Sequence, residues 1–344
     1  MYKISINTTS HNSEIFVGEK WTNVQKYLPE KNVVIVTDEN VHKIYGKDFP
    51  DFPVIKIDPG EESKSLEVIE SLARSFLDLG IDRSGFVLAI GGGVVCDVSG
   101  FLAAIFMRGV RFGFVSSTLL SQVDASVGGK NAVNLGYVKN TLGTFRQPEF
   151  VICDPSMLQT LPEEEYLSGL AELIKNGLIM DETLVSEVEH NNRGILSRDA
   201  DVLTSLIARS VELKASVVRE DEKESGRRMI LNFGHTFGHV IEVLANQKHG
   251  FGVASGMVIA ADISVKERLL QMNDRDRIID LLDKYRLIRE HPVTTGQFEE
   301  LIIRDKKKSG SVINFILLES IGKAIIRKYA PEKLLGLYKS IKQQ

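Results

Sequence analysis

Short runs of β-branched and aromatic residues recur through the first 150 residues, separated by glycine-rich turns and by longer segments with helical spacing. Five such runs are predicted to be strands: residues 33–37, 54–57, 86–90, 112–115 and 151–153. Between the second and third runs, residues 63–79 repeat apolar side chains at the spacing of an amphipathic helix. Because alternating strands and helices build a parallel sheet covered by helices, the first half is predicted to be a Rossmann-like α/β domain.

Beyond residue 154 the pattern changes to longer amphipathic segments, which predict a mostly α-helical second half. The expected helices are residues 163–180, 199–222, 252–270 and 274–285. Two apolar runs joined by Glu-Ser-Ile-Gly, at 313–318 and 323–327, predict a small β-hairpin among these helices. We therefore expect two domains, residues 1–154 and 155–344, with the cleft between them as the ligand site.

The composition argues against several classes of protein. The 344 residues include 42 Lys and Arg and 46 Asp and Glu, a formal net charge of -4, so no global positive field attracts nucleic acid. The N-terminus lacks the pattern of a signal peptide, and no apolar run approaches the roughly 20 residues that cross a membrane. Cys96 and Cys153 form neither a CxxC motif nor a disulfide framework. We expect a cytoplasmic protein that binds any anionic ligand in a local basic pocket.

Glycine and acidic residues follow two of the predicted strands. Gly91 to Gly93 come directly after the strand at 86–90 and before a helix-like run. Glycines at such a point let backbone N–H groups approach a phosphate at a helix N-terminus. Asp38 follows the strand at 33–37, where a carboxylate is placed to accept hydrogen bonds from a ribose. The spacing is not GxGxxG, so a tight strand-to-helix turn without a ligand stays an alternative.

A second glycine-rich connection carries cationic and amide side chains. Residues 124–134 read Asp-Ala-Ser-Val-Gly-Gly-Lys-Asn-Ala-Val-Asn, and Lys139 and Asn140 follow them. Ammonium and amide groups suit a carboxylate or phosphate ligand, although a solvated turn explains the same segment. A P-loop is excluded here because the GxxxxGK[ST] spacing is absent.

The histidines are concentrated in one segment. Three of the seven fall within fifteen residues: His235, His239 and His249. The spacing of four between His235 and His239 places both on one helix face, as in a metal-binding pair. Thr236 stands where the HExxH motif has Glu, which argues against a metalloprotease because the general base is missing.

Glu172 is the candidate for a further ligand on another element. It lies in an apolar stretch, residues 167–173, where a buried carboxylate needs a positive partner. A catalytic zinc commonly has three N or O ligands and one open position. An ion pair with Lys175, three residues further along a helix, explains Glu172 without a metal. The residues alone leave both interpretations open and favour His235 with His239 as the histidine ligands.

Taken together, these segments resemble the 3-dehydroquinate synthases, which belong to the sugar-phosphate cyclase superfamily. The resemblance runs from Thr37-Asp38 to Asp305-Lys306-Lys307. In the order of the family, its blocks are GGGVVCDVSGF, MRG, TLLSQVDASVGGKNAVN with KN, LAELIK, DEKESGRR, LNFGHTFGH, KHG and RDKK.

The resemblance implies a catalytic NAD and a zinc ion, for which Co²⁺ is a potential substitute. It assigns zinc to Glu172, His235 and His249, so His249 takes the place of His239 in the pair favoured by spacing. It assigns NAD to residues at strand ends and in the connections after them: Asp38, Asn40, Glu61, Lys64, Gly91, Gly92, Gly93, Asp97, Ser117, Thr118 and Lys139.

The resemblance also implies a set of substrate-binding side chains: Arg108, Lys130, Asn140, Lys175, Lys214, Arg228, Asn232, His239 and Lys307. It implies a catalytic role for four residues: Asp124, Lys130, Lys175 and His239. Asp124 would lie between the nicotinamide and the metal, and His239 would face the phosphate of the substrate. Arg108 would reach the substrate of the neighbouring subunit in a homodimer. In RDKKK, Lys306 is the alternative to Lys307.

The sequence departs from the family pattern at a few positions. Ser116 replaces the usual Pro before TTLL, and Ser117 replaces its first Thr. The common HGEAVA reads His249-Gly-Phe251-Gly252-Val-Ala. Loss of that Glu removes a potential hydrogen-bond acceptor for a metal-bound histidine. The departures therefore bear on ligand orientation or on substrate choice.

The activity implied by the resemblance is a phosphate-eliminating lyase reaction. It converts 3-deoxy-D-arabino-heptulosonate 7-phosphate to 3-dehydroquinate and phosphate in the shikimate pathway, which leads to chorismate and the aromatic amino acids. Three alternatives are a cyclase acting on sedoheptulose 7-phosphate, a metal-dependent polyol dehydrogenase and a non-catalytic binding protein. The cationic group Lys130, Lys214 and Arg228 argues against the first, because that substrate has no carboxylate. Net production of NADH would mark the second.

Overall fold

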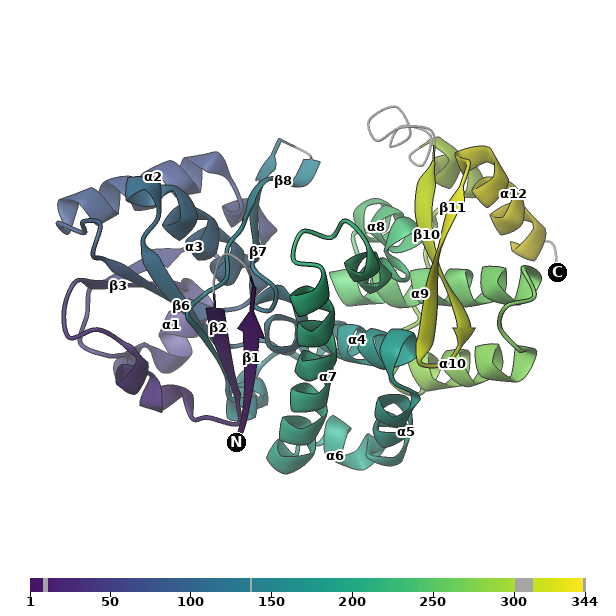
Figure 1. The fold of residues 1–344 in the computed structure, drawn as a ribbon, viewed down its shortest axis with the longest axis horizontal. Helices are drawn as coiled ribbons and strands as arrows, with labels where there is room; N and C mark the ends of the chain where they lie inside the picture. The colour runs from purple at the N-terminus through teal and green to yellow at the C-terminus, as the bar shows by residue number, and fades with distance from the viewer. Residues whose placement is uncertain (9–11, 137, 301–311, 343–344) are drawn as a thin grey trace. The chain divides into compact units, whose positions relative to one another are not determined.

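The computed structural model describes residues 1–8, 12–136, 138–300 and 312–342. The chain forms two compact units (Figure 1): unit 1 is Met1–Pro162 with Gly194–Lys223, and unit 2 is Glu163–Arg193 with Glu224–Gln344. The chain does not divide once after residue 154, as the sequence pattern suggested, because the segment from Gly194 to Lys223 returns to unit 1.

Unit 1 is built on a seven-stranded sheet with the order β1-β2-β9-β6-β5-β3-β4. Its strands are β1 (Tyr2–Asn7), β2 (Asn12–Val17), β3 (Val33–Asp38), β4 (Val54–Ile57), β5 (Phe86–Gly91), β6 (Arg111–Ser116) and β9 (Phe150–Cys153). β1 pairs antiparallel with β2, whereas the other neighbouring pairs are parallel. β5 and β9 are buried throughout, as expected of strands covered on both faces. All five predicted strands are present, which confirms the parallel α/β fold.

The sheet has a topological switch point beside β3. The chain goes from β3 to β4 on one side and then returns to β5 on the other side of β3. In the register of the sheet, Thr37 lies opposite Ile90, and Gly91 lies opposite Ser116. The carboxyl ends of β3, β5 and β6 therefore meet at one edge, which is where open α/β sheets bind ligands.

Helices and one separate hairpin complete unit 1. The helices are α1 (Glu39–Tyr45), α2 (Leu66–Asp78), α3 (Gly93–Ile105) and α7 (Ala200–Glu220), and the hairpin consists of β7 (Lys130–Leu135) and β8 (Val138–Phe145). α2 confirms the helix predicted within residues 63–79. α7 packs against β1 and β2, which explains why this helix belongs to unit 1.

Unit 2 is mostly helical and contains one β-hairpin, as predicted. Its elements are α4 (Glu163–Met180), α5 (Glu182–His190), α8 (His235–Leu244), α9 (His249–Lys266), α10 (Met272–Lys284), β10 (Ile313–Ser320), β11 (Lys323–Tyr329) and α12 (Pro331–Lys342). The short α6 (Asn192–Leu196) spans the point at which the chain changes units. Residues Tyr166 to Ile179 of α4 are all buried, so this helix forms the centre of unit 2.

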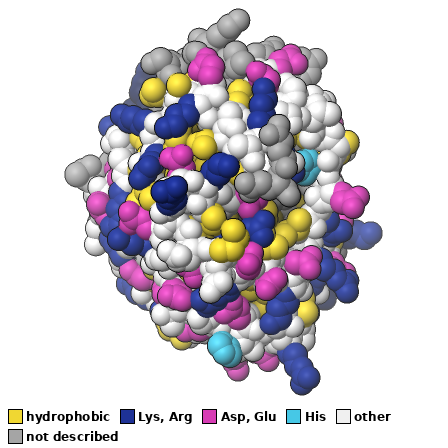
Figure 2. All heavy atoms as spheres, turned by 90° about the vertical axis from the view of Figure 1, so that its right-hand side faces the viewer, with side chains coloured by type: hydrophobic (Ala, Val, Ile, Leu, Met, Phe, Trp, Pro, Cys, Tyr) yellow, Lys and Arg dark blue, Asp and Glu magenta, His cyan; other side chains and the backbone are white. Residues whose placement is uncertain are grey.

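Surface charge and helix hydropathy agree with the composition. Figure 2 shows a face on which basic and acidic side chains are interspersed, in keeping with their nearly equal numbers. Within the described ranges of the chain, every helix is too short or too polar to cross a lipid bilayer.

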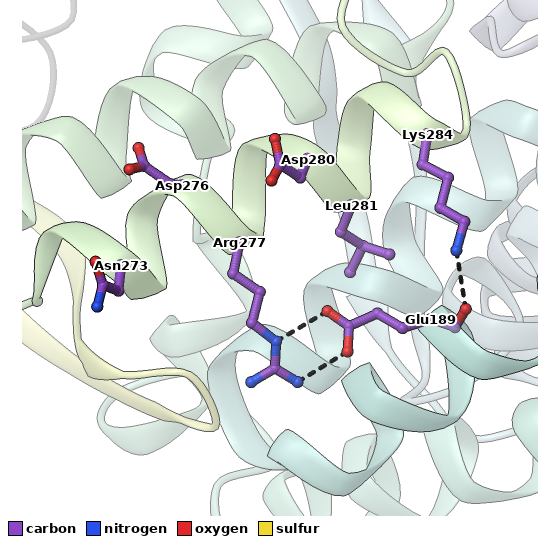
Figure 3. Close-up of a pocket in the computed structure, with 7 residues that line it drawn as sticks. All are labelled: Glu189, Asn273, Asp276, Arg277, Asp280, Leu281 and Lys284. Carbon is purple, nitrogen blue, oxygen red and sulfur yellow. Dashed lines mark hydrogen bonds and ion pairs between the residues drawn. The ribbon is translucent and has the colours of Figure 1, made fainter.

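A pocket on α10 is lined by an ionic clamp, a set of charged groups that joins α10 to α5 in unit 2 (Figure 3). The guanidinium of Arg277 in α10 binds both carboxylate oxygens of Glu189 in α5, at 2.8 and 2.9 Å. Lys284 donates to the backbone carbonyl of Glu189 at 3.0 Å. Because these charged groups are hydrogen-bonded to one another, the clamp is explained by its role in joining the two helices and does not indicate a ligand site.

Candidate functional site

The carboxyl edge of the sheet brings together the residues predicted to bind NAD at β3 and β5. The carboxylate of Asp38 caps α1 by accepting the Val41 N–H at 2.9 Å, and burial raises the pKa of Asp38. Gly92 precedes α3 and has no side chain between the helix N-terminus and the edge of the sheet. The buried Ser117 hydroxyl makes no hydrogen bond within the described part of the chain. Hydroxyl, carboxylate and backbone N–H groups fit the ribose and pyrophosphate of a dinucleotide.

A second group of polar residues in unit 1 surrounds Lys64. Its ammonium donates to Asp97 Oδ2 at 2.6 Å and to Asn140 Oδ1 at 2.5 Å, and Glu61 Oε1 lies 3.9 Å away. Asn134 donates to the same Glu61 oxygen at 3.0 Å. Burial raises the pKa of Asp97 to about 6, although Lys64 acts in the opposite direction. Asn140, predicted to bind substrate, thus shares a network with three residues predicted to bind NAD.

The buried Lys214 and the half-buried Asp124 form an ion pair between different elements of unit 1. Asp124 lies in a single π-helical turn, Ser121–Ala125, a distortion that is frequent at functional sites. The Lys214 ammonium, from α7, donates to the Asp124 backbone carbonyl at 2.7 Å and forms an ion pair with its carboxylate. Lys130 is exposed at the start of β7. The structure therefore pairs two of the predicted residues but does not test their roles in catalysis.

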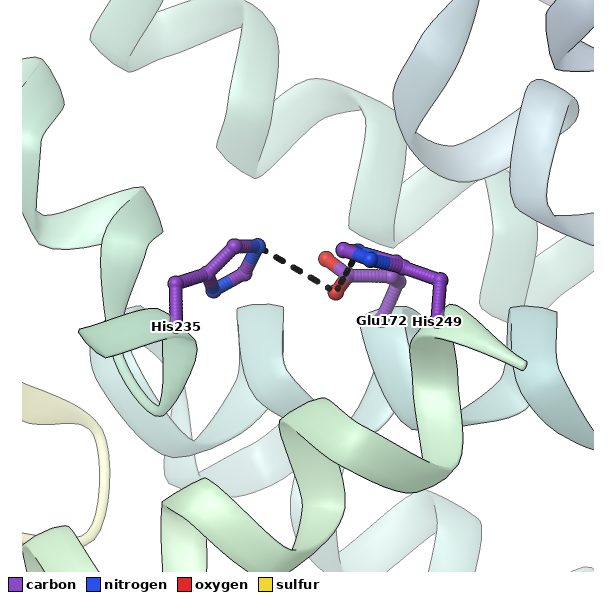
Figure 4. A group of neighbouring side chains, drawn as sticks. All are labelled: Glu172, His235 and His249. Carbon is purple, nitrogen blue, oxygen red and sulfur yellow. Dashed lines mark ion pairs between the residues drawn. The ribbon is translucent and has the colours of Figure 1, made fainter. Parts of the chain in front are cut away.

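In unit 2, Glu172, His235 and His249 converge from three helices (Figure 4). One ligand atom from each of them lies within 4.8 Å of the others. The Glu172 Oε1 is 3.4 Å from His249 Nε2 and 3.8 Å from His235 Nε2. The two histidines are the first residues of α9 and α8, and Glu172 lies in the buried middle of α4. One oxygen and two imidazole nitrogens are a donor set that fits zinc.

Burial and neighbouring charges perturb all three groups. Burial would raise the pKa of Glu172, but Lys175 and the two histidines outweigh it and hold that pKa well below its ordinary value. Burial, with help from Lys175, lowers the pKa of His235. Burial opposes protonation of His249, yet Glu172 and Glu242 raise its pKa to about 10. These two carboxylates therefore favour the protonated form of His249 in the metal-free chain, and a metal would compete with that proton.

The Glu172–Lys175 ion pair considered as an alternative to a metal ligand is also present. Both side chains come from α4 and are almost completely buried, with 0% and 2% exposure. The pair leaves Glu172 Oε1 directed at the two histidines, so pairing with Lys175 and metal ligation use different carboxylate oxygens. Both interpretations of the sequence are therefore compatible with one structure.

The outer nitrogens of both histidines have acceptors. His235 Nδ1 lies 3.1 Å from the carbonyl oxygen of Phe233, and His249 Nδ1 lies 3.0 Å from Glu242 Oε2. Glu242 is not among the residues predicted from the sequence. Its spacing of seven from His235 and three from His239 places it on the same helix face, and this was the available signal.

The remaining predicted residues are distributed over both units. In unit 2, Arg228 is buried, and Asn232 donates to Glu224 Oε1 at 2.8 Å. His239 is exposed, and its ring centre lies 5.1 Å from that of His235. In unit 1, Arg108 is exposed and has a φ of 69°, a strained conformation of the kind that clusters at functional sites. Lys306 and Lys307 lie outside the described residues.

Comparison with known proteins agrees with this architecture. A 2-deoxy-scyllo-inosose synthase, solved with carbaglucose-6-phosphate, NAD⁺ and Co²⁺, superposes with a TM-score of 0.87 and 25% identity over 99% of this chain and all of its own. A 2-epi-5-epi-valiolone synthase from Streptomyces hygroscopicus, solved with NAD⁺ and Zn²⁺, gives a TM-score of 0.88 and 23% identity over 99% of each chain. The fold is therefore that of the sugar-phosphate cyclases.

Sequence similarity narrows this class to one family. Residues 54–168 match the N-terminal and residues 169–308 the C-terminal part of the 3-dehydroquinate synthase family. A 3-dehydroquinate synthase of Pelobacter propionicus is 43% identical over 288 residues, which are 83% of this chain and 80% of the relative. The chain belongs to the 3-dehydroquinate synthase family.

Proposed function

We propose that this chain converts 3-deoxy-D-arabino-heptulosonate 7-phosphate to 3-dehydroquinate and phosphate, the ring closure of the shikimate pathway. The family assignment gives the reaction. The observation in this chain that best supports the reaction is the buried Glu172 carboxylate, which faces His235 and His249. Lys175 pairs with one oxygen of this carboxylate at zero exposure, and a divalent metal would supply a positive partner for the other oxygen, Oε1, which faces the two histidines.

The residues present suit both cofactors of the reaction. We assign zinc, or cobalt in its place, to Glu172, His235 and His249. We assign NAD to the carboxyl edge of the sheet and the network around Lys64. When bound, NAD accepts and returns a hydride, and the metal polarises a substrate oxygen as a Lewis acid.

The side chains around these cofactors bind and orient the substrate. Lys130, Lys214 and Arg228 are assigned to the carboxylate, because a planar guanidinium and compact ammonium groups form charge-assisted hydrogen bonds with it. The buried position of Arg228 supports such a role, since its charge then acts in surroundings with little water. His239 is assigned to the phosphate, Asp124 to the space between the nicotinamide and the metal, and Lys175 to the substrate beside the metal. Asp124 is held in place by Lys214.

Three further assignments concern substrate contacts and the cell. Lys307 is assigned to the substrate by the family pattern, with Lys306 as the alternative. We place the protein in the cytoplasm, which the buried thiols of Cys96 and Cys153, without a disulfide, support. We also propose a homodimer in which Arg108 contacts the substrate of the neighbouring subunit.

One assay separates the proposed reaction from its alternatives. Purified protein is given the heptulosonate phosphate, NAD and zinc, and phosphate and NADH are measured together. The expected result is continuous phosphate release without accumulation of NADH. Stoichiometric NADH would identify a dehydrogenase, and turnover of sedoheptulose 7-phosphate in preference to the heptulosonate would identify the other cyclase. No turnover of any of these compounds would contradict an enzymatic role.

The carboxylate assignment has its own test. Arg228→Ala should lower kcat/KM for the heptulosonate phosphate by about 10- to 150-fold, which corresponds to the loss of one charge-assisted hydrogen bond. For an analogue without the carboxylate, the same substitution should lower kcat/KM far less. The exposed neighbouring variant Arg227→Ala is the matched control and should change neither value. Equal losses for both compounds would show that Arg228 does not select the carboxylate.

The Arg108 assignment predicts complementation between two inactive variants. Heterodimers of Arg108→Ala with Lys175→Met contain one intact site if Arg108 acts across the interface. Activity should then return on mixing and reassociation. Confirmed heterodimers that stay inactive would show that Arg108 acts within its own subunit.

A further inference from the structure

Helices α8 and α9 approach each other at backbone contact distance. The contact runs through two glycines, because a Cβ added to Gly252 would lie 2.6 Å from the Gly238 carbonyl oxygen. A Cβ added to Gly238 would likewise lie 2.8 Å from the Gly252 carbonyl oxygen. Side chains at these positions would force the helices apart, so the glycines determine how close α8 comes to the start of α9.

This approach places Glu242 of α8 against His249 of α9. A Cβ on Gly252 would lie 3.2 Å from the Cβ of Glu242, so the carboxylate occupies the space beside the glycine contact. The Glu242 side chain is 11% exposed, and its Oε2 lies 3.0 Å from His249 Nδ1. The other nitrogen of the same ring lies 3.4 Å from Glu172. The His249 imidazole is therefore held at both of its nitrogens.

Two departures from the family pattern lie at the same contact. Phe251 stands where the family motif has Glu, and its buried ring lies beneath the Arg289 guanidinium at 4.7 Å. It offers no acceptor to a histidine. Gly252 stands where the motif has Ala, and the missing methyl group allows the close approach of α8, because a Cβ at this position would lie only 2.6 Å from the Gly238 carbonyl oxygen. The loss of one carboxylate is accompanied by a contact that brings another to His249.

We propose that Glu242 is a positioning residue for the metal site. The close contact between α8 and α9 at Gly238 and Gly252 places its carboxylate beside His249. The carboxylate accepts the Nδ1–H of His249, which fixes the tautomer and the ring orientation and leaves the Nε2 lone pair for the metal. An acceptor of this kind also makes the imidazole a stronger ligand. The inference rests on the zinc assignment made under the proposed function.

The test measures zinc affinity in the full-length, chelator-treated chain by competition with a chromophoric chelator. Glu242→Ala should bind zinc about 10- to 100-fold more weakly than the wild type. Glu242→Gln keeps a neutral acceptor and should lose less. The matched control is Glu165→Gln, which removes an ion pair with Lys248, the neighbour of His249, at 2.6 Å. Its zinc affinity should be unchanged.

Two further measurements separate positioning from a general loss of structure. The visible absorption of the Co²⁺-loaded protein reports the ligand field, and it should shift in Glu242→Ala but stay unchanged in Glu165→Gln. Gly252→Ala should also weaken zinc binding, because the added methyl group moves α8 and with it the carboxylate. Circular dichroism and the thermal unfolding midpoint identify folded variants, and only these are compared.

The outcomes distinguish this proposal from the zinc assignment itself. If Glu172→Ala retains wild-type zinc affinity, the metal site is wrong and the proposed function loses its main support. If Glu172→Ala loses zinc while Glu242→Ala has unchanged affinity and an unchanged cobalt spectrum, only the role of Glu242 is refuted. His239, Glu242 and His249 form a second group with ligand atoms within 4.8 Å. If Glu242→Ala and His239→Ala abolish binding and Glu172→Ala does not, Glu242 is a ligand and the positioning role is overturned.

Discussion

Replacement of Lys175 by Met is expected to destabilise the metal-free protein strongly. Lys175 and Glu172 form an ion pair with 2% and 0% side-chain exposure, and methionine preserves most of the volume of the lysine side chain. In the variant, the Glu172 carboxylate is left without its ammonium partner in the buried interior of unit 2. Removal of one member of a buried pair costs about 3–5 kcal/mol in other proteins, because the remaining charge cannot be solvated.

The pKa of glutamate sets an upper limit to this loss. Glu172 can escape the penalty by taking up a proton, which at about pH 7 costs roughly 1.36 × (7 − 4.3), or about 3.7 kcal/mol. The nearby His249 offsets part of the charge, so a loss of about 2–3 kcal/mol is expected at about pH 7. At about pH 5 the same proton costs only about 1 kcal/mol, so the loss should shrink as the pH falls. Zinc supplies positive charge at Glu172, so saturating zinc should raise the stability of Lys175→Met more than that of the wild type.

The assay is urea unfolding of chelator-treated protein at several pH values, with and without added zinc. Trp21, the single tryptophan, belongs to unit 1, so far-ultraviolet circular dichroism is the better probe of unit 2. Lys248→Met is the matched control, because it breaks an ion pair with 39% and 43% side-chain exposure and should cost about 0.2–1 kcal/mol. Glu172→Gln combined with Lys175→Met should be less destabilised than Lys175→Met alone. The reasoning is refuted if the two lysine variants lose the same stability, or if the loss in Lys175→Met is independent of pH.

Four further predictions concern Asp97, two glycines and the metal. Burial raises the pKa of Asp97 to about 6, so between about pH 4 and 6 the folded chain binds more protons than the unfolded chain. As the pH rises through this range, urea unfolding should show the wild type losing up to about 3 kcal/mol relative to Asp97→Asn. A Cβ at Gly256 would lie 1.9 Å from the Gly234 carbonyl oxygen, so Gly256→Ala should cost about 3 kcal/mol and lower the thermal midpoint. Gly336 is an exposed position of α12, and no atom of the described residues lies within 4 Å of an added Cβ, so Gly336→Ala should gain about 0.5–1 kcal/mol. Treatment with a chelator should abolish phosphate release, and added zinc should restore it without a lasting increase in NADH absorbance.

The buried parts of the fold were predictable because burial leaves a pattern in the sequence. β5 and β9 appear as continuous apolar runs, and α2 shows one apolar face. β8 is exposed along most of its length, so the β7–β8 hairpin carried no such pattern and was not predicted. The return of α7 to unit 1 could not be predicted either, since an apolar helix face does not reveal which unit it packs against.

The candidate metal group illustrates the same limit. Helical spacing favours His235 with His239, because both lie on α8 and a spacing of four is a local property. His249 begins α9 and meets Glu172 of α4 only through tertiary packing, which no spacing rule encodes. The family resemblance supplied that combination. Helical spacing places Glu242 on the same face of α8 as the two histidines, but its contact with His249 was not predicted because it depends on how closely α8 and α9 pack.

An acidic chain that binds a phosphate and a carboxylate has to keep its cations in place before the ligand arrives. Three of its buried lysines, Lys64, Lys175 and Lys214, each form an ion pair with a carboxylate. In the ligand-free chain, each carboxylate is a partner for its buried ammonium group. The free energy needed to remove that ammonium from water is therefore offset when the chain folds and not when the ligand binds. In the proposed function, Lys175 and Lys214 would exchange one anionic partner for another when the substrate binds. Because both ammonium groups are already buried before the ligand arrives, this arrangement would provide electrostatic preorganisation of the kind that favours catalysis.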